Sequence, residues 1–237
     1  MSRAFADIAF TPSVKAAQTL YGSREANRGF EMVPDKRDHL ETRDIDFIVK
    51  RDSFYQSTVS ENGWPYVQHR GGPEGFLKVI DAKTLAYADF SGNAQYLSVG
   101  NLFANDKIAL ILVDYANRRR LKIWGRAKIV HEHEQPDLIK KLTDPSYQAP
   151  IERAVVITVE ALEFNCPKHI TPRYSEQEVQ DYVGKFSEQV ERLKEQLGAQ
   201  RQEIDSLKEA LALSKPQRIG DKSRNTIVYC EVGQFGR

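Results

Sequence analysis

Residues 64–128 constrain the fold most, because short runs rich in β-branched and aromatic residues alternate there with turns rich in Gly, Asn and Asp. Just before this segment, the Asn62-Gly63 dipeptide is a strong signal for a hairpin turn. From these patterns we expect strands at residues 54–59, 65–68, 76–80, 84–89, 108–114, 121–130 and 154–164. Several short strands with few long helices predict a mainly β fold with helices, built as a barrel rather than as a doubly wound sheet.

Helices are expected at four places. The first covers residues 13–20, with Thr11 or Ser13 as its N-cap and Gly22 or Gly29 after its end. Two more are expected at residues 35–50 and 136–142, and residues 95–104 form either a short helix or an irregular segment. We expect the chain to divide into a helical arm (1–50), a barrel (51–174), a long helix (175–214) and a tail (215–237). Within the tail, residues 226–232 resemble a strand.

Residues 175–213 differ in character, because apolar residues recur there with alternating spacings of four and three. Position a of this heptad holds Val183, Val190, Leu197, Ile204 and Leu211, and position d holds Val179, Phe186, Leu193, Gln200 and Leu207. A 3.5-residue period predicts a coiled coil, and β-branched residues at position a favour two parallel strands. The alternative is an amphipathic helix that packs on its own barrel, but a stripe this narrow favours self-association. Gly184 and Gly198 weaken the helix by about 1 kcal/mol each.

Composition excludes several classes of function. A net charge of +1 gives no general attraction to nucleic acid. The longest apolar runs, such as residues 108–113, are far too short to span a bilayer, and we see no secretory signal. Cys166 and Cys230 show no metal-ligand spacing, so we expect no metal site and two reduced thiols in a cytoplasmic protein. Together with the net charge and the short apolar runs, this predicts no membrane or nucleic-acid partner. His131 and His133 alternate with glutamates, but without a third ligand an exposed strand end is favoured over a metal site.

Candidate ligand-binding residues begin in the segment HRGGPEGFLKV. Its glycines Gly71, Gly72 and Gly75 would let the backbone approach a ligand closely. Arg70 and Lys78 could donate charge-assisted hydrogen bonds to a phosphate. The spacing is neither that of a P-loop nor that of a dinucleotide-binding fingerprint. Taken alone, the segment is also consistent with an ordinary Gly-rich turn.

Two further segments add donors. In ADFSGNAQYL, Ser91 and Asn93 lie where a strand ends and a helix begins, so they form either an anion site or simple capping residues. The turn that contains Arg118, Arg119 and Arg120 is either a solvated patch or a group that reaches an anionic or aromatic partner on another subunit.

In this order of segments the chain resembles the FMN-binding split β-barrel of the pyridoxamine 5'-phosphate oxidase-like family, over about residues 5–175. In that family an Arg-x-x-Leu-Leu-Lys strand precedes a strand that ends in Ser-Arg-Lys, and both bind the FMN phosphate. Lys78 matches the lysine of the first strand, Arg70 takes the place of its arginine, and Ser91 matches the serine. A later hairpin of the family carries Arg-Gln and supplies a flavin contact from the other subunit. Arg120 aligns with the glutamine of that motif.

The resemblance implies one set of FMN-binding residues: His69, Arg70, Gly71, Gly72, Phe76, Lys78, Ser91, Gly92, Asn93, Gln95, Arg119, Arg120 and Lys168. Gly92 and Asn93 replace an arginine and a lysine of the family, so phosphate binding would rely more on Arg70, Lys78 and backbone N–H groups. The oxidase's C-terminal substrate segment has no counterpart, so we expect weak or no oxidation of pyridoxamine 5'-phosphate.

Residues 165–173, NCPKHITPR, resemble instead the ending of a subgroup of the family. Lys168, His169 and Arg173 could line a ligand pocket, with Cys166 near the flavin. A loop that fixes the chain end against the barrel is equally consistent with these residues.

The resemblance implies an FMN-dependent oxidoreductase, a homodimer whose flavin sites lie between the subunits. The flavin itself performs the hydride or electron transfer on a small-molecule substrate, so no catalytic side chain is assigned. The alternative is a non-catalytic flavin- or haem-binding protein that acts as a carrier or stress sensor, with the coiled coil as an interaction module.

Overall fold

The computed structural model of this chain describes residues 2–214. Its contacts divide the chain into two units, Met1–Tyr174 and Ser175–Arg237, and each is described by itself. The strand predicted at residues 226–232, the tail that contains it, and Cys230 lie outside the described residues.

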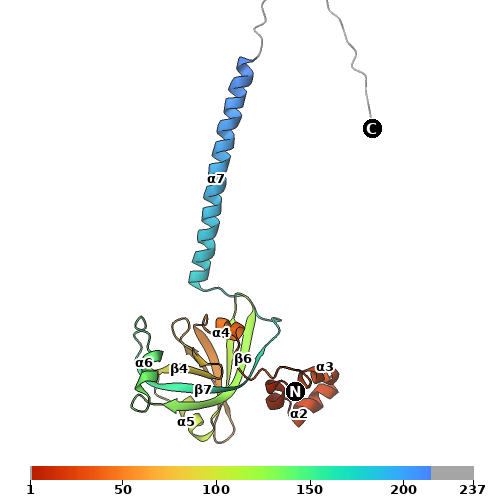
Figure 1. Cartoon of the computed structure of the whole chain (residues 1–237), viewed down its shortest axis with the longest axis vertical. Helices are drawn as coiled ribbons and strands as arrows, with labels where there is room; N and C mark the ends of the chain where they lie inside the picture. Colours follow the sequence, from red (N-terminus) through yellow and green to blue (C-terminus); the bar gives the residue numbers. More distant parts are fainter. Residues whose placement is uncertain (1, 215–237) are drawn as a thin grey trace, which may run out of the picture. The chain divides into compact units, whose positions relative to one another are not determined.

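The first unit is built on seven strands: β1 Ser53–Val59, β2 Pro65–Gly71, β3 Lys78–Asp81, β4 Thr84–Phe90, β5 Lys107–Asp114, β6 Arg119–Val130 and β7 Ile151–Phe164. They form one antiparallel sheet in the order β2-β1-β5-β6-β7-β4-β3. Figure 1 labels three of these strands, β4, β6 and β7. The sheet and its helices confirm the predicted mainly β class and the split-barrel fold. β3 begins two residues later than expected, because Phe76 and Leu77 point into the core instead of pairing.

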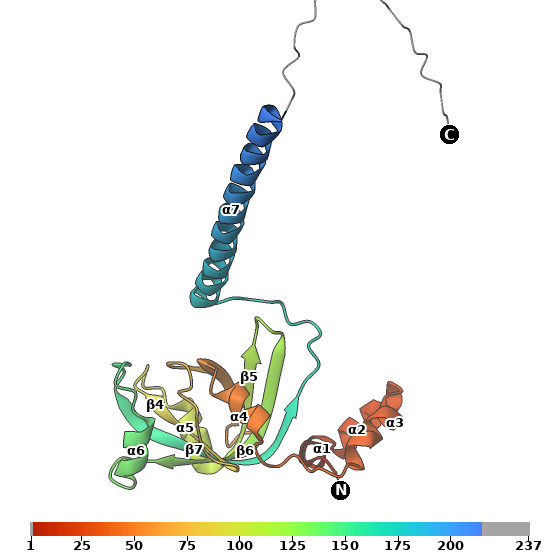
Figure 2. The same ribbon diagram turned by 45° about the horizontal axis from the view of Figure 1, so that its top comes forward.

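Alternation of side chains determines which face of each strand is buried. In β5 the residues Ile108, Leu110 and Leu112 are buried while their neighbours are partly exposed. β1 and β2 form the expected hairpin, in which Val59 pairs with Pro65, and Gly63 adopts a φ of +86° in the turn. Figure 2 shows β5 and β6 side by side as a second, longer hairpin.

The sheet curves until strands that are distant in its order meet. The Tyr87 hydroxyl on β4 donates a 2.5 Å hydrogen bond to Gln56 Oε1 on β1, and burial raises the pKa of that hydroxyl, so it stays a donor. Gly125 lies at a register shift between β6 and β7, where a Cβ atom would come within 2.4 Å of the Thr158 carbonyl oxygen. The barrel interior is a single cluster that includes Phe54, Tyr87 and other apolar side chains.

Short helices accompany the sheet. The predicted helices are confirmed as α2 Pro12–Leu20, whose N-cap is Thr11, and α6 Pro136–Leu142. The segment at 95–104 is a helix, α5 Leu97–Ala104, preceded by an irregular turn. Two further helices in the arm, α1 Ala4–Ala9 and α3 Arg24–Arg28, had no clear sequence signal, and α3 continues into a 3-10 turn, η1 Gly29–Glu31. Helices α1, α5 and α6 pack against strands of the sheet, whereas α2 and α3 pack against each other in the arm.

The long helix predicted at residues 35–50 is wrong, because only α4 Thr42–Ile48 is helical. Arg37 has a φ of +55°, and the Asp35 carboxylate accepts a 2.9 Å hydrogen bond from its backbone N–H. The buried Arg37 side chain then donates to Asp44 at 2.8 Å, so this turn is fixed by an ion pair inside the protein. Just beyond it, hydrogen bonds from His39 and Lys83 lower the pKa of Asp38 to about 2.

The second unit is described as far as residue 214 and consists of the helix α7 Glu176–Leu213. Ser175 caps it: the Ser175 hydroxyl accepts from the Glu178 N–H at 3.2 Å, and the Glu178 carboxylate accepts from the Ser175 N–H at 2.7 Å. No side chain of α7 is buried. The long helix is therefore as predicted, while its association remains a separate question.

Candidate functional site

A cavity of about 260 Å³ opens where β4 ends, bounded by β2, the loop 91–96 and the start of α5. We call it the Arg70 cavity. Its walls are formed by Tyr66, Gln68, Arg70, Asp89, Phe90, Gly92, Asn93, Ala94, Gln95, Tyr96, Leu97, Ser98, Val99 and Glu152. Most of these side chains are polar, so the cavity suits a polar ligand better than an apolar one.

β2 supplies one wall because its side chains alternate. Tyr66, Gln68 and Arg70 lie on the face turned to the cavity, and His69 lies on the opposite face, with its ring 5.4 Å from that of Tyr55. The Ser98 hydroxyl of α5 donates to Gln68 Oε1 at 2.8 Å, which holds the helix start against this wall. The position of Arg70 is thus determined by the strand, whereas His69 points away from this cavity.

Arg70 lies in a buried network of charges. Its Nη1 donates to Asp89 Oδ1 at 2.5 Å, and Arg153 Nε lies 3.6 Å from the other oxygen of Asp89. Arg153 also contacts Glu152. Burial raises the pKa of the Asp89 carboxyl above its usual value, although Arg70 and Arg153 draw it down. The two arginines therefore face two carboxylates, and the network as a whole carries no net charge.

The loop after β4 has an unusual backbone. Ala94 and Tyr96 have φ values of +57° and +53°, in the left-handed region that residues with a Cβ atom seldom adopt. Arg153 stacks on the Tyr96 ring at 4.8 Å, and the Asn93 side-chain oxygen accepts from the Gln95 N–H at 3.2 Å. Such strain persists only where surrounding contacts enforce it, and it is concentrated at binding sites. The loop is therefore held in one shape beside the cavity.

The hydrogen-bond donors around the cavity are of the types that bind phosphate groups. Arg70 Nε is buried and has no hydrogen-bond partner among residues 2–214, so it can still donate to a ligand. Left-handed residues such as Ala94 and Tyr96 also occur in the loops whose successive N–H groups form anion-binding concavities. A Cβ atom at Gly92 would meet nothing within 4 Å, so the mouth of the cavity is open there.

The structure brings together four of the predicted site residues, Arg70, Gly92, Asn93 and Gln95, in the Arg70 cavity. Ser91 lies next to it, exposed, and its N–H donates to the Pro150 carbonyl at 2.9 Å. Phe76 is 5% exposed and stacks on Phe54, so it belongs to the core.

The glycines of the predicted segment serve packing. A Cβ atom at Gly72 would come within 2.7 Å of the Phe76 ring, and one at Gly75 within 2.9 Å of the Val49 carbonyl oxygen. Gly75 also has a φ of +73°. Gly71 ends β2, where a Cβ atom would lie 3.1 Å from the His69 ring. The glycines therefore let the chain turn tightly between β2 and β3. This matches the interpretation of the segment as an ordinary Gly-rich turn.

Lys78 is placed apart from Arg70. It lines a second, shallower cavity of about 640 Å³ beside β3, together with residues of α4 and the preceding loop. Within one chain, the two cations that were expected to share a phosphate thus face different cavities.

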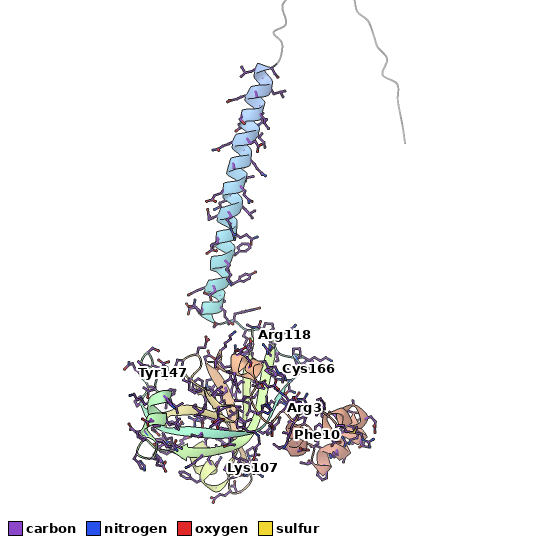
Figure 3. All side chains as sticks on the ribbon, viewed as in Figure 1. Arg3, Phe10, Lys107, Arg118, Tyr147 and Cys166 are labelled. Carbon is purple, nitrogen blue, oxygen red and sulfur yellow. The ribbon has the colours of Figure 1, made fainter. Side chains whose placement is uncertain are left out.

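A third group of predicted residues lies where the β5–β6 turn meets the segment after β7; Figure 3 labels Arg118 in the turn and Cys166 in that segment. The Asn165 N–H donates to the Arg120 carbonyl at 3.1 Å, and Arg173 stacks on Tyr115 at 5.2 Å. These contacts fasten the segment that contains Lys168 to the hairpin. Arg119 lies over the rings of Phe47 and Phe164, each at 5.2 Å, and the buried Arg120 Nε has no partner within residues 2–214.

Sequence reasoning missed Asp89, Glu152 and Arg153. The available signal was Asp89, an acidic residue in an otherwise apolar strand. Because a buried carboxylate requires a cationic partner, this residue could have indicated a buried ion pair. The partner itself had no local signal, because Arg153 is far away in the chain and meets Asp89 only through the pairing of β4 with β7.

Other site types find no support in the described part of the chain. Among residues 2–214, no three His, Cys, Asp or Glu side chains gather closely enough to hold a metal ion, and the His131 and His133 rings stack at an exposed turn. None of the helices within that range has both the length and the apolarity needed to cross a bilayer.

Comparison with known proteins identifies a family. The family model described as pyridoxamine 5'-phosphate oxidase matches residues 45–166. No curated protein matches the chain. Among solved structures, a variant of HupZ from Group A Streptococcus is 21% identical, with a TM-score of 0.44, over 53% of this chain and 98% of the other.

Two more solved structures are similar at this level. A Clostridium acetobutylicum protein related to general stress protein 26 is 19% identical, with a TM-score of 0.40, over 53% of this chain and 86% of the other. An FMN-binding protein from Syntrophomonas wolfei is 18% identical, with a TM-score of 0.40, over 65% of this chain and 95% of the other.

Proposed function

We propose that this chain, which belongs to the pyridoxamine 5'-phosphate oxidase family, binds FMN and works as an FMN-dependent oxidoreductase on a small-molecule substrate. The observation that carries the proposal is the Arg70 cavity, which Arg70 and the strained loop at the end of β4 line together. In the order of the chain, these are the two segments that the family uses for the flavin phosphate. The buried Arg70 Nε has no hydrogen-bond partner within residues 2–214.

In this proposal the phosphate is held by Arg70, by the side-chain amides of Asn93 and Gln95, and by N–H groups of the loop 91–96 other than those of Ser91 and Gln95, which donate within the protein. When bound, FMN supplies hydride or electron transfer through its isoalloxazine ring. Asp89 holds the Arg70 guanidinium in position, and Arg153 holds the loop through its contact with Tyr96. The protein's own part is therefore binding and orientation, and we assign no side chain as a general acid or base.

The size of the cavity supports a site shared between two subunits. Pockets that enclose a drug-sized ligand measure about 300–1,000 Å³, whereas the Arg70 cavity measures about 260 Å³. It can enclose a phosphate and part of its attached chain, but a flavin ring would extend beyond it. We propose that a second copy covers that ring in a homodimer, with Lys78, Arg119, Arg120 and Lys168 as the residues that could reach it from other parts of the two chains.

An absorbance spectrum of the purified full-length protein, with mass analysis of any released ligand, tests this function. We expect a flavin spectrum that a reductant bleaches, and a released mass equal to that of FMN. Release of haem, or failure of the purified protein to bind added FMN, would overturn the proposal. Turnover of NAD(P)H or another donor by the FMN-loaded protein supports the oxidoreductase, whereas flavin binding without turnover with any donor tested favours a carrier.

A further inference from the structure

Helix α7 has a narrow apolar stripe along its length that nothing in its own unit covers. Val179 and Leu211, near the two ends of the stripe, are 48% and 64% exposed, and no residue of the helix is buried. At 1.5 Å per residue the 38-residue helix is about 57 Å long. Most helices owe their stability to packing of their apolar face, so an uncovered stripe of this length marks an interaction surface.

We infer that this stripe pairs with the same stripe of a second copy, as a parallel coiled coil in register. The inference is independent of flavin binding, since it concerns only α7. It rests on the charged residues beside the stripe and on the single polar residue within it.

The residues that flank the stripe distinguish parallel from antiparallel pairing. Position e holds Lys194, Arg201 and Lys208, and position g holds Gln189, Gln196 and Glu203. In a parallel pair each g residue faces the e residue of the following heptad in the other helix, so all three basic side chains meet an amide or a carboxylate. In an antiparallel pair the basic e positions would face one another. Charge complementarity therefore favours the parallel arrangement.

One contact between the copies is a full ion pair, from Glu203 to Lys208 of the second copy. Within one chain Lys208 contacts Asp205 at 3.2 Å, but both side chains are more than 70% exposed. Exposed pairs of this kind add little stability and leave Lys208 available to a partner. Glu203 has no ion pair within residues 2–214.

Gln200 determines the register. It is the one polar residue at a core position of the heptad. In a parallel pair without a shift, Gln200 faces the Gln200 of the second copy, and the two amides can each donate and accept. A shift by one heptad would place the amide against Leu193 or Leu207 and leave it buried without a partner, which is strongly unfavourable. A polar residue at a single a position specifies register in coiled coils, and Gln200 would do the same at position d.

Disulfide trapping in the full-length protein tests the pairing. In a background of Cys166→Ser and Cys230→Ser, we would introduce Phe186→Cys or Leu207→Cys, at d positions far apart on the helix. The matched controls are Glu188→Cys and Glu209→Cys, which lie on the opposite face of the same turns. Far-UV circular dichroism confirms that each variant keeps its helix, and Leu193→Cys provides a third d position that leaves Gln200 in place.

Under mild oxidation we expect each d variant to form covalent dimers at least about tenfold faster than its control, because pairing raises the effective thiol concentration. Equal rates at d and control positions would overturn the inference. So would cross-linking that appears only when Phe186→Cys and Ile204→Cys proteins are mixed, because an antiparallel pair with aligned ends places this d position against this a position.

A charge exchange examines the ion pair separately. Adding Glu203→Lys to the Leu207→Cys protein should slow cross-linking, and adding Lys208→Glu as well should restore the rate. Failure of the second change to restore it would contradict the predicted contact between Glu203 and Lys208.

Discussion

The strongest test of the proposed site is removal of the Arg70 guanidinium by Arg70→Met. The change keeps an unbranched side chain of similar length but removes the charge and every donor of the Arg70 side chain. Two quantities should change for different reasons: the free energy of unfolding, because Asp89 loses its partner, and the affinity for FMN, because the phosphate loses its cation.

The effect on stability follows from the burial of the pair. The side chains of Arg70 and Asp89 are 15% and 6% exposed, and their charged atoms lie 2.5 Å apart. Removing one partner of a buried ion pair destabilises a protein by about 3–5 kcal/mol. Because Arg153 stays 3.6 Å from Asp89 and partly compensates its charge, we expect a loss near the lower end, about 3 kcal/mol.

The effect on affinity is estimated separately. Truncation of a buried charged partner weakens binding by about 2–5 kcal/mol, which at about 1.4 kcal/mol per tenfold is roughly 30-fold to 4,000-fold in dissociation constant. Riboflavin lacks the phosphate, so its affinity should change far less. The difference between the two ligands isolates the contact with the phosphate from any general damage to the cavity.

The assays are urea unfolding of the ligand-free protein and fluorescence titration with FMN and riboflavin, at a temperature where the variant is folded. Arg126→Met is the matched control, since Arg126 is 48% exposed and its ion pairs with Asp106 and Glu160 lie on the surface. That control should leave stability nearly unchanged, because its ion pairs are exposed to solvent. If Arg70→Met lowers stability but leaves FMN affinity within about twofold, Arg70 serves only to hold Asp89, and our reasoning about the phosphate is refuted.

Three further predictions concern other parts of the first unit. Asp89→Asn keeps a side-chain oxygen that can accept from Arg70 but removes the negative charge that competes with the phosphate, so FMN affinity should rise, by up to about tenfold, while urea unfolding shows lower stability; weaker FMN binding would contradict this. Asp38 has a pKa of about 2 in the folded protein, so the stability that it contributes is complete above its unfolded pKa of about 3.9 and is lost as the pH falls towards 2. Asp38→Asn should therefore be less stable than the parent at neutral pH and equal to it near pH 2, as measured by urea unfolding across that range. Gly125→Ala places a Cβ atom 2.4 Å from a backbone oxygen of β7 and should destabilise by about 1–3 kcal/mol, whereas Gly100→Ala, in open space on α5, should not; equal thermal midpoints would contradict the packing argument.

The strands could be predicted from the sequence because their signal is local. Alternation of apolar and polar residues, the Asn62-Gly63 turn and Pro136 at the start of α6 are each contained within a few residues. The helix at residues 35–50 was wrong for the opposite reason. Its apolar positions fit a helix, but Arg37 adopts a left-handed turn because its side chain pairs with Asp44 inside the protein. Tertiary contacts of this kind override the local pattern.

The site was predictable only in outline. Arg70 and the loop from Ser91 to Gln95 could be selected because basic and small polar residues at strand ends suit an anion. Their companions could not be selected, since Asp89 meets Arg153 only through the register of β4 and β7. The left-handed conformation at Tyr96 had no local signal, because such a conformation is usually predicted from a glycine and none stands there. The Tyr96 ring instead contacts Arg153, which is distant in the sequence.

The charge balance of the Arg70 cavity bears on how the whole molecule is assembled. Arg70 and Arg153 face Asp89 and Glu152, so the network is neutral before any ligand arrives. A phosphate with nearly two negative charges would make it anionic, which favourable binding must offset with further cations or backbone dipoles. The loop N–H groups supply dipoles, but the other cations of the predicted set face different parts of the same chain: Lys78 beside β3, and the arginines of the β5–β6 turn. A second copy of the chain is the simplest source of the missing charge, so the neutral cavity and its small volume both support a site that two subunits complete together.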